Sequence, residues 1–215
     1  MPSNPLNPSY PTIGIIGAGR LGTAIARQSL RAGYKVRIAN SRGPESLGLM
    51  LSVLLPGAVA STADEAVMNS DVIVLAIPLN QYVSLKPELF DDKIVIDAMN
   101  YWPPTEGDIP EFMDEAVTSS EYIQRYLKGA RVIKTLNHTA YNELEQHSLP
   151  VGSADRRAIA LVGDDAAAKQ TVEKIISDIG FDPVDLGQLS HGHKFQPDTP
   201  LFNARYTAEH LKNSR

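Results

Sequence analysis

Residues 12–22 read Thr-Ile-Gly-Ile-Ile-Gly-Ala-Gly-Arg-Leu-Gly and decide the fold. The apolar run 12–16 is typical of a buried parallel strand. Residues 17–22 follow at once and fit the spacing G-x-G-x-x-G. The pattern over 20–32, with Gly33 just beyond it, predicts a helix. The stretch therefore predicts a strand, a tight turn and a helix in direct succession.

Glycines at these three positions have separate physical roles in a dinucleotide site. Gly17 permits the tight turn, Gly19 lets the backbone approach a pyrophosphate, and Gly22 lets the helix pack closely on the strand. The helix then offers unpaired N–H groups and its positive dipole end to phosphates. The alternative is that the glycines merely turn the chain. We predict that this part of the site comprises Gly17, Ala18, Gly19, Arg20, Leu21 and Gly22.

The end of the next strand indicates which dinucleotide is bound. A site that prefers NAD carries Asp or Glu about 20 residues on, where the acid binds the ribose 2′-hydroxyl. Here the expected strand 34–39 is followed by Asn40, Ser41 and Arg42, with no carboxylate. A hydroxyl and a guanidinium suit a 2′-phosphate, which a carboxylate would repel. The alternative is that Arg42 is a solvated surface arginine. We predict that the cofactor is NADP(H).

The rest of the chain alternates strands with helices, which predicts a doubly wound, mainly parallel α/β sheet of the Rossmann type with a small carboxyl-terminal appendage. An irregular loop is expected over 98–118, and a capping box opens a helix at Thr62 to Glu65. The other expected strands are 58–61, 71–77, 93–97, 131–136, 158–162 and 183–186. The other expected helices are 44–55, 79–90, 120–128, 140–146, 165–179 and 199–212. We expect a flexible tail over 1–11, an NADP-binding domain over 12–150 and a small α/β extension over 151–215 that completes the substrate cleft.

Composition limits the classes of partner. A net charge of −5 disfavours nucleic acid, which needs a basic surface. With 0 cysteines there is no disulfide framework and no thiolate site, which fits a cytoplasmic protein. No segment is apolar for the roughly 18 residues of a membrane helix, and the first residues do not resemble a signal peptide. We therefore expect a cytoplasmic protein without nucleic-acid or membrane partners.

Several longer runs are similar to one family. They are GIIGAGRLG (14–22), IANSRGPESL (38–47), DVIVLAIP (71–78), IVIDAMN (94–100), RVIKTLNH (131–138), VGDD (162–165) and GFDPVDLGQL (180–189). Together they resemble the NADPH-dependent oxidoreductases that use the deazaflavin coenzyme F-420. The nucleotide-binding domain of the six-transmembrane metalloreductases shares that fold. The SRGPESL segment is the more specific part of the resemblance, because glycine turns occur in many families.

The resemblance implies a role for particular residues. Ser41 and Arg42 would bind the 2′-phosphate, and Ala76, Ile77 and Pro78 would line the dinucleotide. Asn100 and the segment 134–138, which includes Asn137, would face the nicotinamide. Coenzyme F-420 or a flavin would then stack as second substrate between that segment and the carboxyl-terminal part. The expected activity is hydride transfer between NADP(H) and a deazaflavin, a flavin or a similar small redox partner.

Three alternatives remain open. Hydride transfer between two such rings needs little acid–base help from protein. A carbonyl or imine reductase would need a proton donor, for which His138 or Tyr101 is a candidate, although a hydrogen-bonded histidine at a loop start fits His138 equally. A non-catalytic NADP(H) sensor or assembly module is the third reading. His191 and His193 lack a third ligand, so we expect a flexible loop and no metal. The short appendage suggests that a homodimer completes the cleft.

Overall fold

The structure is a computed structural model that describes residues 9–113 and 116–213. Most of the flexible tail predicted over 1–11 therefore lies outside the described residues. Where the description begins, the ring of Tyr10 stacks on that of Tyr34 at 4.6 Å. The Lys174 ammonium lies 4.7 Å from the centre of the Tyr10 ring. Tyr10 is thus packed against the domain.

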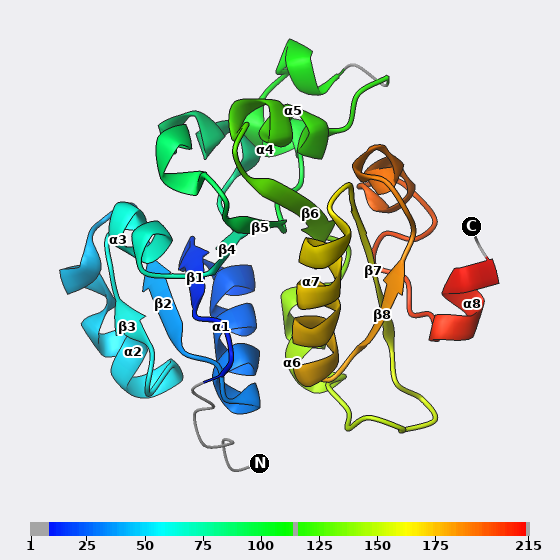
Figure 1. Cartoon of the computed structure of the whole chain (residues 1–215), viewed down its shortest axis with the longest axis horizontal. Helices are drawn as coiled ribbons and strands as arrows, with labels where there is room; N and C mark the ends of the chain where they lie inside the picture. Colours follow the sequence, from blue (N-terminus) through cyan, green and yellow to red (C-terminus); the bar gives the residue numbers. More distant parts are fainter. Residues whose placement is uncertain (1–8, 114–115, 214–215) are drawn as a thin grey trace.

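One eight-stranded sheet forms the centre of the molecule, in the order β3-β2-β1-β4-β5-β6-β7-β8 (Figure 1). Neighbouring strands are parallel except β6 and β7, which are antiparallel. The predicted doubly wound, mainly parallel sheet is confirmed. The strands are β1 Ile13–Ile16, β2 Val36–Ala39, β3 Val59–Ala60, β4 Val72–Leu75, β5 Ile94–Asp97, β6 Arg131–Thr135, β7 Ala158–Gly163 and β8 Asp182–Asp185.

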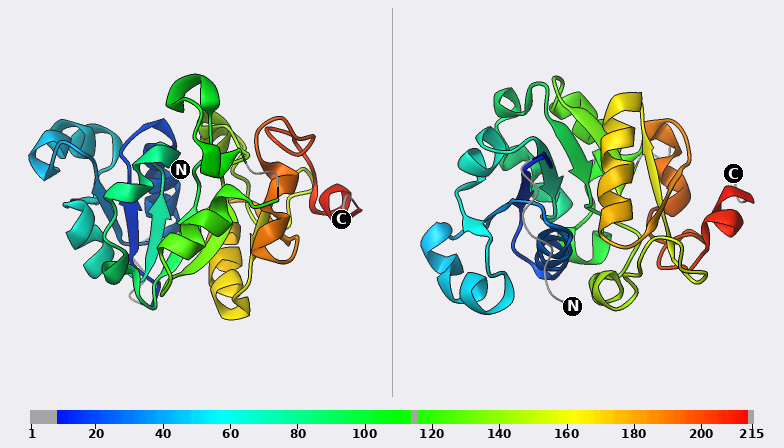
Figure 2. Two further views of the ribbon diagram at one scale, coloured as in Figure 1. Left: turned by 90° about the horizontal axis from the view of Figure 1, so that it is seen from above. Right: turned by 60° about the horizontal axis from the view of Figure 1, so that its bottom comes forward.

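Helices cover both faces of the sheet (Figure 2). The α-helices are α1 Arg20–Ala32, α2 Gly48–Leu54, α3 Ala63–Met68, α4 Pro103–Glu106, α5 Ser119–Tyr126, α6 Tyr141–Gln146, α7 Ala166–Asp178 and α8 Ala208–Asn213. The 3₁₀ helices are η1 Pro44–Leu47, η2 Leu79–Ser84, η3 Pro87–Phe90, η4 Pro110–Phe112 and η5 Leu189–Phe195. Among the described residues, no helix has both the length and the apolar character needed to cross a membrane.

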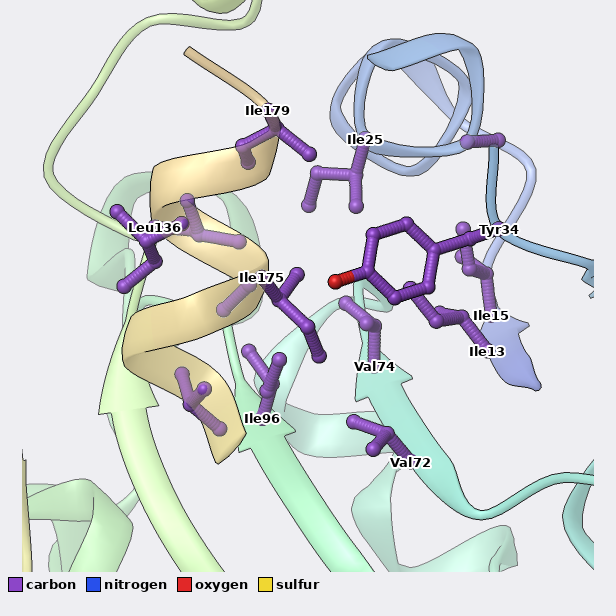
Figure 3. Packing of buried hydrophobic residues seen from close by; sticks show 14 of the residues in the cluster. Ile13, Ile15, Ile25, Tyr34, Val72, Val74, Ile96, Leu136, Ile175 and Ile179 are labelled. Atoms are coloured by element: carbon purple, nitrogen blue, oxygen red, sulfur yellow. The ribbon is translucent and has the colours of Figure 1, made fainter. Parts of the chain in front are cut away.

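The alternation of side chains along each strand produces two hydrophobic cores. Ile13 and Ile15 of β1 pack on one face with Ile25 of α1 and Ile175 of α7 (Figure 3). Side chains of α3, α5 and η5 pack on the other face. Gly14 lies between these layers, where a Cβ would come within 2.6 Å of a carbonyl oxygen of α3. Burial on both faces explains why the central strands β1 and β4 contain no polar side chain.

Strong local signals predicted several elements correctly. The helix expected over 20–32 is α1, and Gly33 ends it with φ 95°. The capping box at Thr62 and Glu65 is present, with both hydrogen bonds made. Asp165 caps α7 by accepting from the Ala168 N–H at 2.7 Å. These signals act within one turn, so tertiary packing does not override them.

Three predicted elements were wrong in part. The helix expected over 79–90 is instead two 3₁₀ helices. A proline disfavours helical backbone angles in the residue before it, and Lys86, which precedes Pro87, is extended. The irregular loop over 98–118 contains α4 and η4. The helix expected over 199–212 is helical only from 208 to 213. Upstream, the Asn203 N–H donates to His138 O, and Tyr206 O accepts from the β7 residue Ala158.

The segment after residue 150 continues the same sheet. β7 pairs with β6 and β8 pairs with β7, so this extension shares its core with the amino-terminal part. α7 packs over β6, β7 and β8 (Figure 1). The reversal of direction at β7 sets η5 and the loop around residue 195 beside the end of β6.

Candidate functional site

The glycine turn joins β1 to α1 in a conformation that side chains would not permit. Gly17 has φ 115°, and a Cβ there would lie 2.3 Å from Ala76 O. A Cβ on Gly22 would lie 1.9 Å from Gly17 O. Gly19 differs, because a Cβ on it would meet nothing within 4 Å. Gly17 and Gly22 are therefore required for the turn itself, whereas Gly19 faces open space.

The amino terminus of α1 is open to a ligand. Gly19 is its N-cap and makes no side-chain cap hydrogen bond, and the first turn carries no acidic residue. N–H groups of a first helical turn have no intrahelical partner, so they are available to an anion. The geometry suits a pyrophosphate, as the sequence predicted.

A cavity of about 540 Å³ lies beside this turn. Its wall combines the turn with the carboxyl ends of β1, β2 and β4, which is where ligands bind in doubly wound sheets. The cavity is lined by Ile16, Gly17, Ala18, Gly19, Ala39, Asn40, Ser41, Arg42, Ala63, Asp64, Val67, Ala76, Ile77, Pro78, Gln81, Ser84, Leu85, Lys86, Leu89 and Phe90. The predicted residues of the turn and of the β2 and β4 ends are thus brought together.

Arg20, Leu21 and Gly22 do not line the cavity. The Arg20 guanidinium lies 5.5 Å from the centre of the Tyr141 ring on α6. Leu21 packs against the core. Their contribution to a cofactor site, for which the backbone N–H groups of the first helical turn are available, remains a prediction.

The loop after β2 is shaped by Asn40. Its Oδ1 accepts the Arg42 N–H at 3.0 Å, and its Nδ2 donates to Ser46 Oγ at 2.8 Å. Within the described part of the chain, no protein group engages the Ser41 hydroxyl or the Arg42 guanidinium, and both side chains are exposed. Asn40 therefore holds the loop, while Ser41 and Arg42 stay available to a ligand at the rim of the cavity.

Sequence reasoning missed the wall of the cavity opposite this loop. Lys86 follows η2 and pairs with Asp64 of α3, with 2.5 Å between Nζ and Oδ2. A hydrogen bond and the charge of Asp64 raise the pKa of Lys86. Asp64 lies within the capping box of α3, which indicates a helix start and not a cavity wall. The incorrect helix over 79–90 hid the turn that carries Lys86.

Asn100 and Asn137 lie outside the cavity and bind each other. Asn100 Nδ2 donates to Asn137 O at 2.8 Å, and Asn137 Nδ2 donates to Asn100 Oδ1 at 3.0 Å. Asn137 Nδ2 also lies 3.0 Å from Phe195 O. The pair joins the turns that follow β5 and β6 to the end of η5.

His138 is buried, which speaks against the role of proton donor. Its Nε2 accepts the Ala160 N–H at 3.2 Å, which places the proton on Nδ1, 3.3 Å from Asn137 Oδ1. Burial, with help from the charges of Arg157 and Lys134, lowers the pKa of His138 to about 3. Such an imidazole stays neutral at neutral pH and supports β7. The structural alternative noted for this residue is the better fit.

The buried His138 predicts a pH dependence of stability. Below its ordinary pKa of 6.5 the unfolded chain takes up a proton that the folded chain refuses until about pH 3. We therefore expect the free energy of unfolding to fall by about 1.4 kcal/mol for each pH unit below 6.5 on account of this group. Denaturant titrations at several pH values measure the slope. His138→Gln keeps an acceptor for Ala160 and should lack this contribution, and equal slopes in both proteins would contradict the assignment.

Other candidate residues serve the structure around the site. The Tyr101 hydroxyl donates to Gly107 O and accepts from the Ile109 N–H, both at 2.7 Å, so it holds the 98–113 loop. The half-exposed Trp102 ring stacks on Phe202 with centroids 6.5 Å apart. His191 and His193 lie in η5 rather than in a flexible loop. The Nδ1 atom of each lies 2.8 Å from a backbone carbonyl.

The sheet order, the glycine turn and the cavity at the strand ends define a doubly wound dinucleotide-binding protein. Comparison with known proteins agrees. Residues 12–101 match the family model described as "NADP oxidoreductase coenzyme F420-dependent". The crystal structure of a hypothetical protein of Sinorhizobium meliloti is 31% identical with a TM-score of 0.79, and the alignment covers 93% of this chain and 96% of that one.

Two further relatives extend the comparison. A putative F420-dependent NADP-reductase from Arthrobacter sp. FB24 shares the fold, with TM-score 0.70, 24% identity and coverage of 83% of this chain and 85% of that one. Metalloreductase STEAP3 of Rattus norvegicus is 27% identical over 189 residues. That match takes in 86% of this chain but 36% of the metalloreductase, so the chain spans about a third of that relative. The part of the chain over residues 12–101 belongs to the family of NADP oxidoreductases described as coenzyme F420-dependent.

Proposed function

We propose that the chain binds NADP(H), with the adenosine and phosphate end in the 540 Å³ cavity and the nicotinamide beyond it, and passes hydride between the nicotinamide and a small flat redox partner, such as a deazaflavin or a flavin. One observation carries the proposal: Ser41 and Arg42 stand at the rim of the cavity, free of protein partners among the described residues. No carboxylate stands with them at the end of β2. A guanidinium beside a hydroxyl suits a phosphate ester.

The sheet order supports one direction for the cofactor. The pyrophosphate would lie at the turn after β1, beside the neighbours β2 and β4 in the order β2-β1-β4-β5-β6. With the 2′-phosphate at the end of β2, the nicotinamide would extend past β4 towards the ends of β5 and β6. Asn100 and Asn137 stand there. Amide groups of this kind can bind the carboxamide of the nicotinamide once they exchange their mutual hydrogen bonds.

The chain's residues then bind, orient and exclude water, while the nicotinamide and its partner carry the reacting atoms. Support for the second candidate, a carbonyl or imine reductase, is weaker. His138 is neutral and buried, and the Tyr101 hydroxyl is committed to Gly107 and Ile109. A reaction that needs a proton donor finds neither of the predicted ones available.

The identity of the acceptor is tested with a panel of candidate acceptors. We expect the protein to oxidise NADPH in the presence of coenzyme F-420 or a free flavin. The loss of the absorbance of reduced nicotinamide measures the rate. Reduction of a cyclic imine or ketone, with no turnover of the flat rings, would favour the second candidate. Tight binding of NADPH without turnover of any acceptor would favour a sensor or assembly module. Arg42→Ala, assayed with limiting NADPH, controls for oxidation outside the site.

The assembly and location of the protein stay predictions. A homodimer would offer a partner for the apolar side chains of α2, of which Leu49 is 79% and Val53 is 67% exposed. A cytoplasmic location stays an expectation that rests on the composition without cysteine. Sedimentation of the purified chain measures the first of these.

A further inference from the structure

A buried ion pair links β5 and β6 beneath the turn that carries Asn100. Asp97 is the last residue of β5 and stands opposite Lys134 of β6 in the sheet register. Both side chains are 0% exposed, and Lys134 Nζ lies 3.3 Å from Asp97 Oδ2. Neither group reaches the cavity of the cofactor. The segment 134–138 is expected to face the nicotinamide, but the Lys134 side chain itself is buried and its ammonium points to Asp97.

Two further hydrogen bonds of this pair hold the chain just after β5. Asp97 Oδ1 accepts the Met99 N–H at 3.0 Å. Lys134 Nζ donates to Met99 O. On its other side Asp97 Oδ2 accepts from Ser120 Oγ of α5 at 2.6 Å. Both polar groups of the Met99 backbone are thus bound by the two members of one ion pair.

Both side chains of the pair are enclosed by the packing of the surrounding elements. Gly192 of η5 covers the Lys134 stem, and a Cβ on this glycine would lie 3.6 Å from Lys134 Cγ. Burial lowers the pKa of Lys134. The charge of Asp97 and the hydrogen bond between Asp97 and Lys134 act in the opposite direction and raise it. Asp97 accepts from three donors, which is the pattern of an ionised carboxylate.

A contribution to the stability of the fold does not by itself explain why a buried ion pair stands here. Apolar residues of similar volume often replace buried ion pairs without loss of stability, because taking two charges out of water is costly. What apolar residues could not do here is bind the N–H and the C=O of Met99. The residue after Met99 is Asn100, whose amide makes reciprocal hydrogen bonds with Asn137.

We propose that Asp97 and Lys134 are positioning residues for the nicotinamide end of the site. By fixing Met99 they set the orientation of Asn100 at the place where the sheet order puts the nicotinamide. The inference rests on the proposed function for the identity of the ligand. The new element is that the orientation of Asn100 at the nicotinamide end depends on an ion pair that does not contact the cofactor.

The test compares two ligands in calorimetry. One is NADP⁺, and the other is 2′-phospho-ADP-ribose, which keeps the phosphates but lacks the nicotinamide. The variant Lys134→Met keeps the length of the side chain and removes its donor. We expect its affinity for the fragment to stay within about twofold, and the advantage of NADP⁺ over the fragment to fall by about tenfold, the upper end of the range for one lost hydrogen bond between neutral groups.

A second variant separates positioning from stability. Asp97→Asn combined with Lys134→Met removes both charges, so it should recover the stability lost on leaving Asp97 unpaired. It should not recover the advantage of NADP⁺, because Met99 O still lacks its donor. Arg156→Met is the matched control, since Arg156 is also a buried cation but binds Leu149, Ser177 and Asp182 instead. It should leave the advantage unchanged.

Two results would overturn the inference. One is a folded Lys134→Met or double variant that keeps the full advantage of NADP⁺ over the fragment. The other is an equal loss of affinity for both ligands, which indicates general damage to the fold. Failure of the proposed function looks different, because the unmodified protein would then bind neither ligand.

Discussion

We expect the Gly19→Ala variant to bind NADPH about 150-fold more weakly, a loss of about 3 kcal/mol, while its free energy of unfolding does not fall. Gly19 has φ −77° and ψ −170°, which alanine adopts readily. The added methyl group meets no protein atom within 4 Å. It occupies the space through which a pyrophosphate approaches the N–H groups of α1, so it costs charge-assisted hydrogen bonds and no packing. Calorimetric titration with NADPH and denaturant unfolding measure the two quantities.

Two other glycines provide matched controls. Gly48→Ala also places a methyl group in open space, on α2 and away from the cavity, so neither quantity should fall. Gly22→Ala forces a Cβ to within 1.9 Å of Gly17 O, and we expect about 1–3 kcal/mol of lost stability. A Gly19→Ala variant that is stable and binds NADPH normally would show that the turn does not approach a phosphate.

The second large effect is expected at Arg42. Arg42→Ala should weaken NADPH binding by about 1.5–3 kcal/mol, or roughly 10- to 150-fold, the range for a hydrogen bond to a charged group. NADH lacks the 2′-phosphate, so its affinity should hardly change. No protein group among the described residues holds the guanidinium, and the backbone turn made by Asn40 does not involve its side chain. Stability should therefore remain that of the parent.

The control for charge is Arg31→Ala. Arg31 is also exposed and lies in the last turn of α1, at the end of the helix opposite to the phosphate site. Arg31→Ala changes the net charge by the same amount as Arg42→Ala. Any difference in NADPH affinity between the two variants therefore depends on where the arginine lies. If Arg42→Ala lowers the affinities for NADPH and NADH by the same factor, Arg42 does not bind the 2′-phosphate.

Local chemistry explains which parts of the fold could be predicted from sequence. Residues 13–33 are a strand, a glycine turn and a capped helix whose signals lie within a few residues of each other. Residues 79–90 form no regular helix, because the extended backbone before Pro87 interrupts the helical pattern. The region 199–207 is shaped by hydrogen bonds to His138 and β7, partners far away in sequence. Such long-range contacts leave no periodic signal.

The site shows the same division. Ser41 and Arg42 could be placed at the edge of the cavity because they follow a strand whose position in the sheet was predictable. Lys86 and Asp64 could not be placed there, since their contact depends on how α3 packs beside η3. The contact of Lys134 with Asp97 could not be predicted for a related reason. Its place at the end of a strand was correct, but the direction of its side chain depends on the neighbouring strand.

The most direct test of the account is a pair of calorimetric titrations of the unmodified protein, one with NADPH and one with NADH, at the same salt concentration. A phosphate held by Ser41 and Arg42 predicts that NADPH binds at least about tenfold more tightly. Equal affinities for the two cofactors would contradict it.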